Sequence, residues 1–386
     1  MPTITNPNNR DFFTMTREEH ACFSLRTLYE QYGYSQYKMS KFEEYDLYVR
    51  NKNFLVSDHI ITFTDHTGRL LALKPDVTLS IVKNGRDLPG KISRIYYNEN
   101  VYRTTPGGRD FREINQVGLE CIGELDTYLL SEVLTLAVKS LKRASRTIAG
   151  LRQAPDYLLE ISHLDVVSRM LDSLSVTESV KEEILVCIGE KNVHDIVRIC
   201  ERAGVAKDRI AALQTLVAAD GAPDEVLPVL FSLARENSAL REPAEELSRT
   251  VAALPASVKD KIRLDFSLLS DMTYYNGIVF RGYIKGIPDG VLSGGRYDRL
   301  MRKMNRSSDA IGFAVYLDRL AGYYTQAPGE AYETVLLYDD QTDMRALNEK
   351  MEECAQTHGQ TVAVRTLPET WCVGQVIDMR GGRRDE

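Results

Sequence analysis

The stretch 101–123 restricts the fold of this 386-residue chain more than any other segment. An apolar and aromatic run ends at Arg103, and the sequence Pro-Gly-Gly follows at 106–108. A proline and two glycines interrupt a strand and favour a turn. The flanking residues therefore predict two strands, over 92–103 and 112–122, with a turn between them.

The second of these strands has one apolar and one polar face, because its side chains alternate in kind and a strand turns alternate side chains to opposite sides. The polar face carries Gln116, Gly118 and Glu120. A glycine between an amide and a carboxylate leaves room for a small ligand. A strand with a solvated outer face shows the same alternation and is the more common explanation. The pattern alone leaves both interpretations open.

Composition argues against several classes of protein. A formal net charge of −7 disfavours a broad nucleic-acid-binding face. No apolar run approaches the roughly 18 residues that a membrane-spanning helix needs, and the first residues do not have the pattern of a signal peptide. The six cysteines and six histidines are scattered, without metal-ligand spacing. We therefore expect a cytoplasmic protein with no membrane segment, no disulfide frame, no metal site and no cofactor.

Helical and strand patterns divide the chain into three parts. At 386 residues it exceeds one ordinary hydrophobic core, so two or three domains are expected. We assign 1–150 and 261–327 to a discontinuous core, 151–260 to an all-helical insertion, and 331–386 to a small C-terminal α/β unit. Hairpin turns, rather than strand–helix alternation, connect the core strands. This favours an α+β fold with an antiparallel sheet flanked by helices.

Individual elements can be placed within these parts. The insertion shows six short helical patterns separated by Gly, Pro and polar turns, and the tail shows strand, helix and two further strands. The other core elements are expected as follows: a helix from a capping box at 16–19 toward Gly33, a hairpin over 60–73, a helix through 78–83, a helix over 128–146, strands over 263–267 and 274–283, a turn at 294–298, and a strand that continues as a helix over 310–320.

Five segments resemble motifs of the class II aminoacyl-tRNA synthetases, and in detail those of the histidyl-tRNA synthetase branch. In chain order they are Lys74–Thr78, Tyr102–Gln116 (motif 2), Tyr274–Phe280, Gly294–Asp298 and Gly312–Leu320 (motif 3). They occur in the family's order and together span about 70–325 of the chain. The resemblance implies the antiparallel sheet of that family and its histidine pocket.

The chain departs from the synthetase pattern where that family performs its chemistry. Ser270 replaces an arginine that stabilises charge on the reacting phosphate, Thr105 replaces a motif 2 glutamate, and Tyr316 replaces a motif 3 glycine. Phosphoryl transfer depends on such cations, and a phenol at 316 is expected to fill part of the ATP site. The motif 1 proline is absent near Ser40, and the tail after Pro328 is short for an anticodon-binding domain. We therefore expect neither histidine activation nor tRNA binding.

The amino-acid pocket of the family is retained. The residues that match its histidine-binding positions are Asp76, Thr78, Gln116, Glu120, Tyr274 and Tyr275, and the matched motif 2 arginine is Arg103. Carboxylates, amides and hydroxyls suit the ammonium and ring nitrogens of histidine, and an arginine suits its carboxylate. Asp76 and Thr78 equally suit the first turn of a helix as capping residues. The whole set could also be a relic that only holds the fold.

A histidyl-tRNA synthetase-like chain without ATP chemistry or a tRNA domain resembles the regulatory subunits of ATP phosphoribosyltransferase. This resemblance implies a non-catalytic chain that activates a short-form catalytic subunit in a hetero-oligomer, at the first step of histidine biosynthesis, with L-histidine as feedback inhibitor. A self-dimer through the synthetase-like core is also expected. Two alternatives remain: an active histidyl-tRNA synthetase, or a paralogue that activates histidine with ATP for another acceptor; and a structural scaffold whose pocket is vestigial.

Overall fold

The computed structural model describes residues 16–51, 60–85, 90–104, 110–149, 153–269, 272, 274–323, 331–358, 360–368 and 371–381. The chain forms two compact units, and the larger one comprises 17–149 and 153–323. The smaller unit contains the described residues 331–381. The division into a core, an insertion and a C-terminal unit stays a prediction. Among the described residues, no helix is long and apolar enough to span a membrane.

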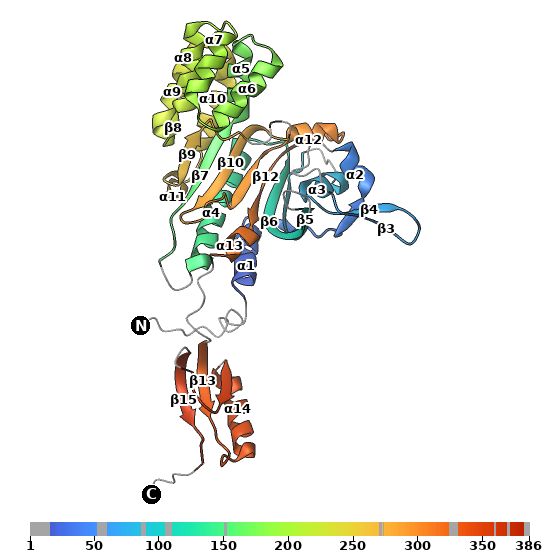
Figure 1. Cartoon of the computed structure of the whole chain (residues 1–386), viewed down its shortest axis with the longest axis vertical. Helices are drawn as coiled ribbons and strands as arrows, with labels where there is room; N and C mark the ends of the chain where they lie inside the picture. The colour runs from blue at the N-terminus through green and yellow to red at the C-terminus, as the bar shows by residue number, and fades with distance from the viewer. Residues whose placement is uncertain are drawn as a thin grey trace. The chain divides into compact units, whose positions relative to one another are not determined.

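A nine-stranded sheet forms the centre of the larger unit (Figure 1). In spatial order its strands are β1 (Ser35–Gln36), β5 (Ser93–Thr104), β6 (Phe111–Gly123), β12 (Asp309–Tyr316), β11 (Leu292–Arg296), β10 (Asn276–Ile284), β7 (Tyr157–His163), β9 (Ile262–Asp265) and β8 (Asp220–Gly221). Neighbouring strands are antiparallel except for β1 with β5 and β7 with β9. The expected α+β fold with a largely antiparallel sheet is confirmed.

The strands expected over 92–103 and 112–122 are β5 and β6, which pair along their whole length. From Gln116 on, both faces of β6 are buried: Leu119 is 0% exposed on one side, and Gln116 and Glu120 are 4% and 2% exposed on the other. The polar face of this strand is therefore not a solvated outer face.

Two helices, α1 (Arg17–Gln31) and α4 (Thr127–Ala149), pack on one face of this sheet. The Tyr29 ring of α1 lies edge-on to the Phe313 ring of β12, with ring centroids 6.1 Å apart. Phe313 pairs with Leu119 across the sheet, so the apolar side chains of β6 and β12 face these helices and form the main core. Side chains at alternate positions, including Gln116 and Glu120, must then point to the opposite face.

The segment 151–260 was expected to be entirely helical, and this expectation is wrong at its start and at the short strand β8. Tyr157–His163 forms β7, between β10 and β9 in the sheet. Its helices are α5 (Leu164–Ser173), α6 (Glu178–Gly189), α7 (Val193–Arg202), α8 (Lys207–Ala218), α9 (Pro223–Glu236), α10 (Arg241–Ala252) and α11 (Ala256–Lys259). Figure 1 shows α5 to α10 gathered as one green and yellow group. The six expected helical patterns correspond to these six helices.

The turn expected at 294–298 is also wrong, because β11 continues to Arg296 and α12 (Asp298–Lys303) follows. The glycines there serve close packing in the sheet. A Cβ atom at Gly294 would lie 2.2 Å from the carbonyl oxygen of Gly312, and one at Gly295 would lie 2.8 Å from the Tyr275 ring. Two adjacent glycines indicated a turn in the sequence. In the structure they instead allow β12 and the Tyr275 ring to lie close to the backbone of β11.

A second, three-stranded sheet contains the expected hairpin, with β4 (Leu70–Leu73) between β2 (Phe42–Glu44) and β3 (Thr62–Thr64). Gly68 in the turn has a φ of +85°, a backbone conformation that favours glycine. After β2 comes α2 (Tyr45–Arg50), and after β4 comes α3 (Thr78–Asn84). The chain from β4 into α3 therefore runs through 74–78, the first of the segments with family resemblance.

The smaller unit has the element order expected from the sequence. Its elements are β13 (Ala331–Leu337), α14 (Met344–His358), β14 (Thr361–Val364) and β15 (Cys372–Asp378). The three strands are parallel, with β13 in the centre. Leu336, Leu347 and Cys354 form the core between the sheet and α14.

Candidate functional site

A pocket lies on the face of the large sheet that α1 and α4 do not cover. Its cavity volume is about 80 Å³, and it is partly open to solvent. All seven candidate residues line it, namely Asp76, Thr78, Arg103, Gln116, Glu120, Tyr274 and Tyr275. The structure thus brings together residues that are up to about 200 positions apart in the chain. Whether they hold histidine stays a prediction.

Glu120 lies at one end of the pocket with both carboxylate oxygens hydrogen-bonded. The Thr78 hydroxyl donates to Oε1 at 2.9 Å, and the Tyr297 hydroxyl donates to Oε2 at 2.8 Å. Burial raises the pKa of Glu120 to about 8, the two hydroxyl donors oppose this rise, and the nearby Asp76 carboxyl adds to it. A carboxyl group with this pKa is mostly protonated at neutral pH in the ligand-free pocket.

Two glycines shape the floor of the pocket. A Cβ atom at Gly312 of β12 would lie 1.7 Å from Oε2 of Glu120, so this glycine makes room for the carboxylate. Gly118 of β6 was expected to leave room for a ligand. Instead, a Cβ atom there would lie 2.4 Å from the hydroxyl of Tyr97, so the space beside Gly118 holds the Tyr97 phenol.

Asp76 both caps a helix and lines the pocket. Its Oδ1 accepts a hydrogen bond of 2.8 Å from the backbone N–H of Leu79 in the first turn of α3. Burial raises the pKa of Asp76, while hydrogen bonds from backbone N–H groups and the charges of Arg103 and Lys74 oppose the rise. Asp76 is therefore both a capping residue of α3 and a residue that lines the pocket.

Arg103 and Lys74 surround this carboxyl with positive charge. Nε of Arg103 donates to the carbonyl oxygen of Pro75 at 3.0 Å, which ties the arginine to the segment that carries Asp76. Nζ of Lys74 is fully buried and lies 2.9 Å from Oε2 of Glu99. Lys74 therefore fixes this segment against β5, a role that the sequence did not reveal.

Four tyrosines form the walls. The Tyr274 and Tyr275 rings lie 4.5 Å apart between centroids at an angle of 60°, and Tyr274 lies 6.1 Å from Tyr297. Burial raises the pKa values of Tyr97, Tyr274 and Tyr297 well above the usual value of 10. Their hydroxyl groups are therefore neutral over the whole physiological range and can donate hydrogen bonds. Tyr297 belongs to a motif noted in the sequence but was not selected as a site residue.

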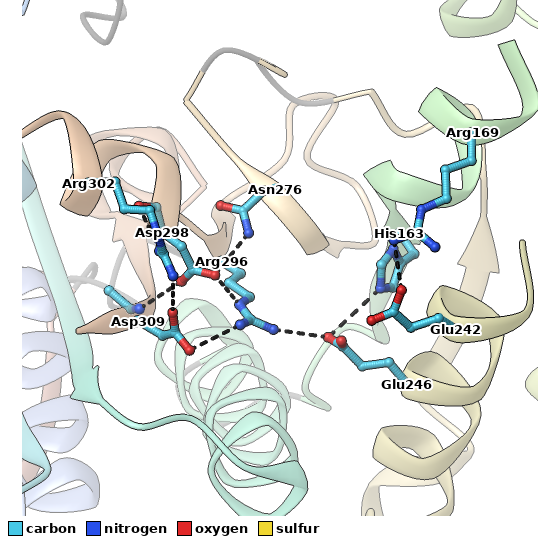
Figure 2. Close-up of polar contacts among 10 residues, drawn as sticks. His163, Arg169, Glu242, Glu246, Asn276, Arg296, Asp298, Arg302 and Asp309 are labelled. Carbon is cyan, nitrogen blue, oxygen red and sulfur yellow. Dashed lines mark hydrogen bonds and ion pairs between the residues drawn. The ribbon is translucent and has the colours of Figure 1, made fainter. Parts of the chain in front are cut away.

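The residues on either side of Tyr297 are fixed by an ion-pair network, which Figure 2 shows with Arg296 at its centre. Arg296 lies 2.6 Å from Asp298, 3.2 Å from Asp309 and 3.3 Å from Glu246. Glu246 belongs to α10, so the helical insertion contacts the segment that places Tyr297 in the pocket. Nε2 of His163 lies 3.8 Å from Oε1 of Glu246, and the proximity of His163 and Arg296 lowers the pKa of Glu246.

The departures from the synthetase pattern have different outcomes. Tyr316 lines the pocket, and its hydroxyl forms a hydrogen bond of 2.7 Å with the Ser293 hydroxyl. The guanidinium of Arg319 lies over the Tyr316 ring, 4.5 Å from its centroid. Ser270 and Thr105 lie outside the described residues. Within the described part of the chain, no group of three or more His, Cys, Asp or Glu residues is arranged to hold a metal.

The strand register places Glu120 and Arg103 toward opposite ends of the pocket, with Asp76 close to Arg103. Glu120 pairs with Gly312, whereas Gln116, four residues along β6, pairs with Tyr316. On β5, Glu99 pairs with Gln116 and Arg103 lies further along in the same direction. The pocket therefore offers a guanidinium group and two carboxyl groups to a small polar ligand.

Comparison with known proteins agrees with this geometry. The histidyl-tRNA synthetase family model matches residues 13–320. An ATP phosphoribosyltransferase regulatory subunit from Oceanobacillus iheyensis is 26% identical over 309 residues, covering 79% of this chain and 73% of the relative. A histidine–tRNA ligase from Methanocaldococcus jannaschii is 28% identical over 318 residues, covering 81% of this chain and 73% of the ligase.

Solved structures share the fold. A Bacillus halodurans protein described as an ATP phosphoribosyltransferase regulatory subunit/histidyl-tRNA synthetase has a TM-score of 0.73 at 20% identity, over 99% of this chain and 100% of that one. A chain of the ATP phosphoribosyl transferase complex from Thermotoga maritima has a TM-score of 0.59 at 19% identity, over 78% of this chain and 97% of that one. With a family model that spans most of its length and a pocket built from that family's motifs, the chain belongs to the histidyl-tRNA synthetase family.

Proposed function

We propose that this chain is a non-catalytic regulatory subunit of ATP phosphoribosyltransferase, which activates a short-form catalytic subunit and senses L-histidine. The relatives named as such regulatory subunits support the role. The observation that carries the proposal is the contrast within one pocket: all seven candidate residues for holding an amino acid line it, while Tyr316 stands in the place of a glycine. In this proposal the chain assembles with the catalytic subunit and with a second copy of itself, in the cytoplasm.

Each polar group of L-histidine has a partner in the pocket. Arg103 suits the α-carboxylate, because a guanidinium recognises carboxylates with paired donors. Asp76 and Gln116 suit the α-ammonium. The imidazole suits the end with Glu120, where the carboxyl group can accept a ring N–H in its ionised form. Thr78 suits the α-ammonium as well, and because its hydroxyl already donates to Glu120, it also positions that carboxyl group.

Burial gives these contacts their selectivity. Glu120 is 2% exposed, and a buried carboxyl group that loses its partners costs far more than an exposed one. A ligand without a ring nitrogen at this position would leave Glu120 without its third partner. The pocket is therefore expected to prefer histidine over amino acids of similar size that lack a polar ring.

Reconstitution tests the regulatory role. Purified chain is mixed with a short-form catalytic subunit, and phosphoribosyl transfer is measured against the catalytic subunit alone. We expect the chain to increase the rate in a saturable way, and a stoichiometric complex to appear on size-exclusion chromatography. Absence of any activation over a wide ratio of the two chains would exclude the proposal.

The alternative of an active synthetase requires ATP chemistry. The similarity to a histidine–tRNA ligase is the observation that keeps it in view. Histidine-dependent exchange of pyrophosphate into ATP measures this chemistry directly. We expect no exchange above the background without histidine. Exchange at a rate typical of the synthetases would favour the alternative.

A further inference from the structure

The row of β12 residues that faces the pocket has small side chains except at one end. On β12, the residues that face the pocket are Gly312, Ala314 and Tyr316. Ser293 of β11 lies beside them. Among these described residues, Tyr316 is therefore the only one with a large side chain, and it lies at the end of the row.

Tyr316 lies at the end of the pocket that is distant from Glu120. It pairs with Gln116, four residues along β6 from Glu120, and four residues of a strand span about 13 Å. Arg103 extends in the same direction along β5. The anionic end of a bound zwitterion therefore lies on the side where Tyr316 stands.

Two contacts hold the phenol in place. Its hydroxyl is hydrogen-bonded to the Ser293 hydroxyl at 2.7 Å, which bridges β11 and β12. Its ring carries the Arg319 guanidinium, 4.5 Å from the centroid, and Nη1 of Arg319 donates to the carbonyl oxygen of Gly290. Arg319 is exposed and is not among the residues that line the pocket, so these contacts hold its guanidinium outside the pocket. Tyr316 thus closes one end of the pocket, and its ring also binds the Arg319 guanidinium.

We propose that Tyr316 is the specificity-determining residue that limits the pocket to ligands ending in a free carboxylate. Ligands with a larger or more highly charged anionic end, such as a phosphate ester, are excluded because the phenol fills that space and Arg319 is not available to them. The inference rests on the proposed function, since the free carboxylate is taken to be that of L-histidine. It concerns only the end of the pocket that would hold the anionic group of the ligand, and not the end that would hold the imidazole.

The test compares wild type with Tyr316→Ala and Tyr316→Phe by isothermal calorimetry. The alanine variant removes the ring and releases Arg319, whereas the phenylalanine variant keeps the ring and loses only the bond to Ser293. The first probe is L-histidinol phosphate, which keeps the imidazole and the amine and carries a phosphate ester in place of the carboxylate. The second is inorganic pyrophosphate, which needs no imidazole site. Thermal unfolding checks that each variant is folded, and Tyr316→Ser replaces the alanine variant if that variant is unstable.

We expect Tyr316→Ala to bind L-histidinol phosphate roughly tenfold or more tightly than wild type, as expected for one added charge-assisted hydrogen bond to a phosphate. Pyrophosphate should bind to this variant alone, and Arg319→Gln in the same background should remove the gain. Equal affinities of wild type and folded Tyr316→Ala for both probes would overturn the inference. Failure of wild type to bind L-histidine counts against the proposed function, while the pyrophosphate comparison still decides the role of Tyr316.

Discussion

Glu120 combines deep burial with two hydroxyl donors, and this combination makes the ligand-free chain sensitive to pH. Its pKa in the folded chain is about 8, against 4.5 for an ordinary glutamate. Between these two values the folded state holds a proton that the unfolded state has lost, so stability falls as the pH rises. The contribution is fully present below about pH 4.5 and is lost above about pH 8. A shift of this size corresponds to roughly 5 kcal/mol at most.

The substitution Glu120→Gln should remove this loss of stability, because an amide does not titrate. We expect the free energy of unfolding of wild type to fall more steeply between about pH 5 and pH 8.5 than that of the variant. Urea unfolding at several pH values measures the difference. Glu113→Gln, at an exposed position of the same strand, should follow the wild-type profile. Parallel profiles of wild type and Glu120→Gln would show that Glu120 does not titrate in this range.

Gly312 tests whether the position of the Glu120 carboxylate matters for binding. In Gly312→Ala the new methyl group would lie within contact of Oε2, so the carboxylate must move. We expect a loss of stability of about 1–3 kcal/mol and a clear loss of L-histidine affinity, measured by chemical unfolding and calorimetry. Gly322→Ala is the matched control, since a Cβ atom at Gly322 has no atom within 4 Å. Unchanged histidine binding in folded Gly312→Ala would argue against Glu120 as a ligand group.

At the residue scale, the seven residues selected from the sequence all line one pocket, whereas the residues that support them were not predicted. The candidate residues carry groups that a zwitterion requires, so chemistry and family motifs both indicate them. Tyr297, Gly312 and Lys74 act through contacts across strands far apart in the chain, with Glu120 and Glu99 as their partners. Such contacts depend on strand register, which composition and spacing do not specify.

Strand β11 and the start of α12 connect the pocket with the helical insertion. Tyr297 contacts Glu120, while its neighbour Arg296 contacts Glu246 of α10. Asp298 accepts a hydrogen bond from Asn276, at the start of β10, and is paired with Arg296. Contacts with β6, α10 and β10 therefore hold this segment in place. A change in the contact between Arg296 and α10 would affect the pocket through Tyr297, the next residue along the chain.

Glu246→Ala should reduce both stability and histidine affinity, because Arg296 loses a partly buried partner. A loss of about 1–3 kcal/mol of unfolding free energy is expected, together with severalfold weaker binding of L-histidine in calorimetry. Glu242→Ala provides the control from the same helix, since its carboxylate is 77% exposed and pairs with Arg169. Exposed pairs contribute little. Equal effects of the two substitutions on histidine affinity would contradict a link through Arg296.

Most elements could be predicted from periodicity and turn residues, and the errors at β7 and β11 have physical causes. β7 is a short apolar run that leads directly into α5, and a run of that length does not distinguish a buried strand from a helix. In β11 the glycines at 294 and 295 satisfy tertiary packing, which overrides their usual meaning as turn residues. Local patterns fail where a distant neighbour decides the conformation.

As a whole, the molecule keeps the fold of its family, and the seven candidate residues line one pocket. Tyr316 and Ser293 are hydrogen-bonded to each other at the end of this pocket where Gln116 lies. In the proposed function, the chain responds to L-histidine through binding alone. Coupling between such a site and an assembled partner is typically about 1–3 kcal/mol, enough to change affinity 5- to 150-fold.

Inhibition by histidine of the reconstituted phosphoribosyltransferase tests the central claim most directly. L-Histidine is titrated into mixtures of a short-form catalytic subunit with wild type, with Glu120→Ala or with Glu113→Gln as control. We predict that all three chains activate the catalytic subunit, and that histidine inhibits the wild-type and control mixtures but has little effect on the Glu120→Ala mixture. Equal sensitivity of the Glu120→Ala and wild-type mixtures to histidine would contradict the claim that this pocket is the histidine sensor.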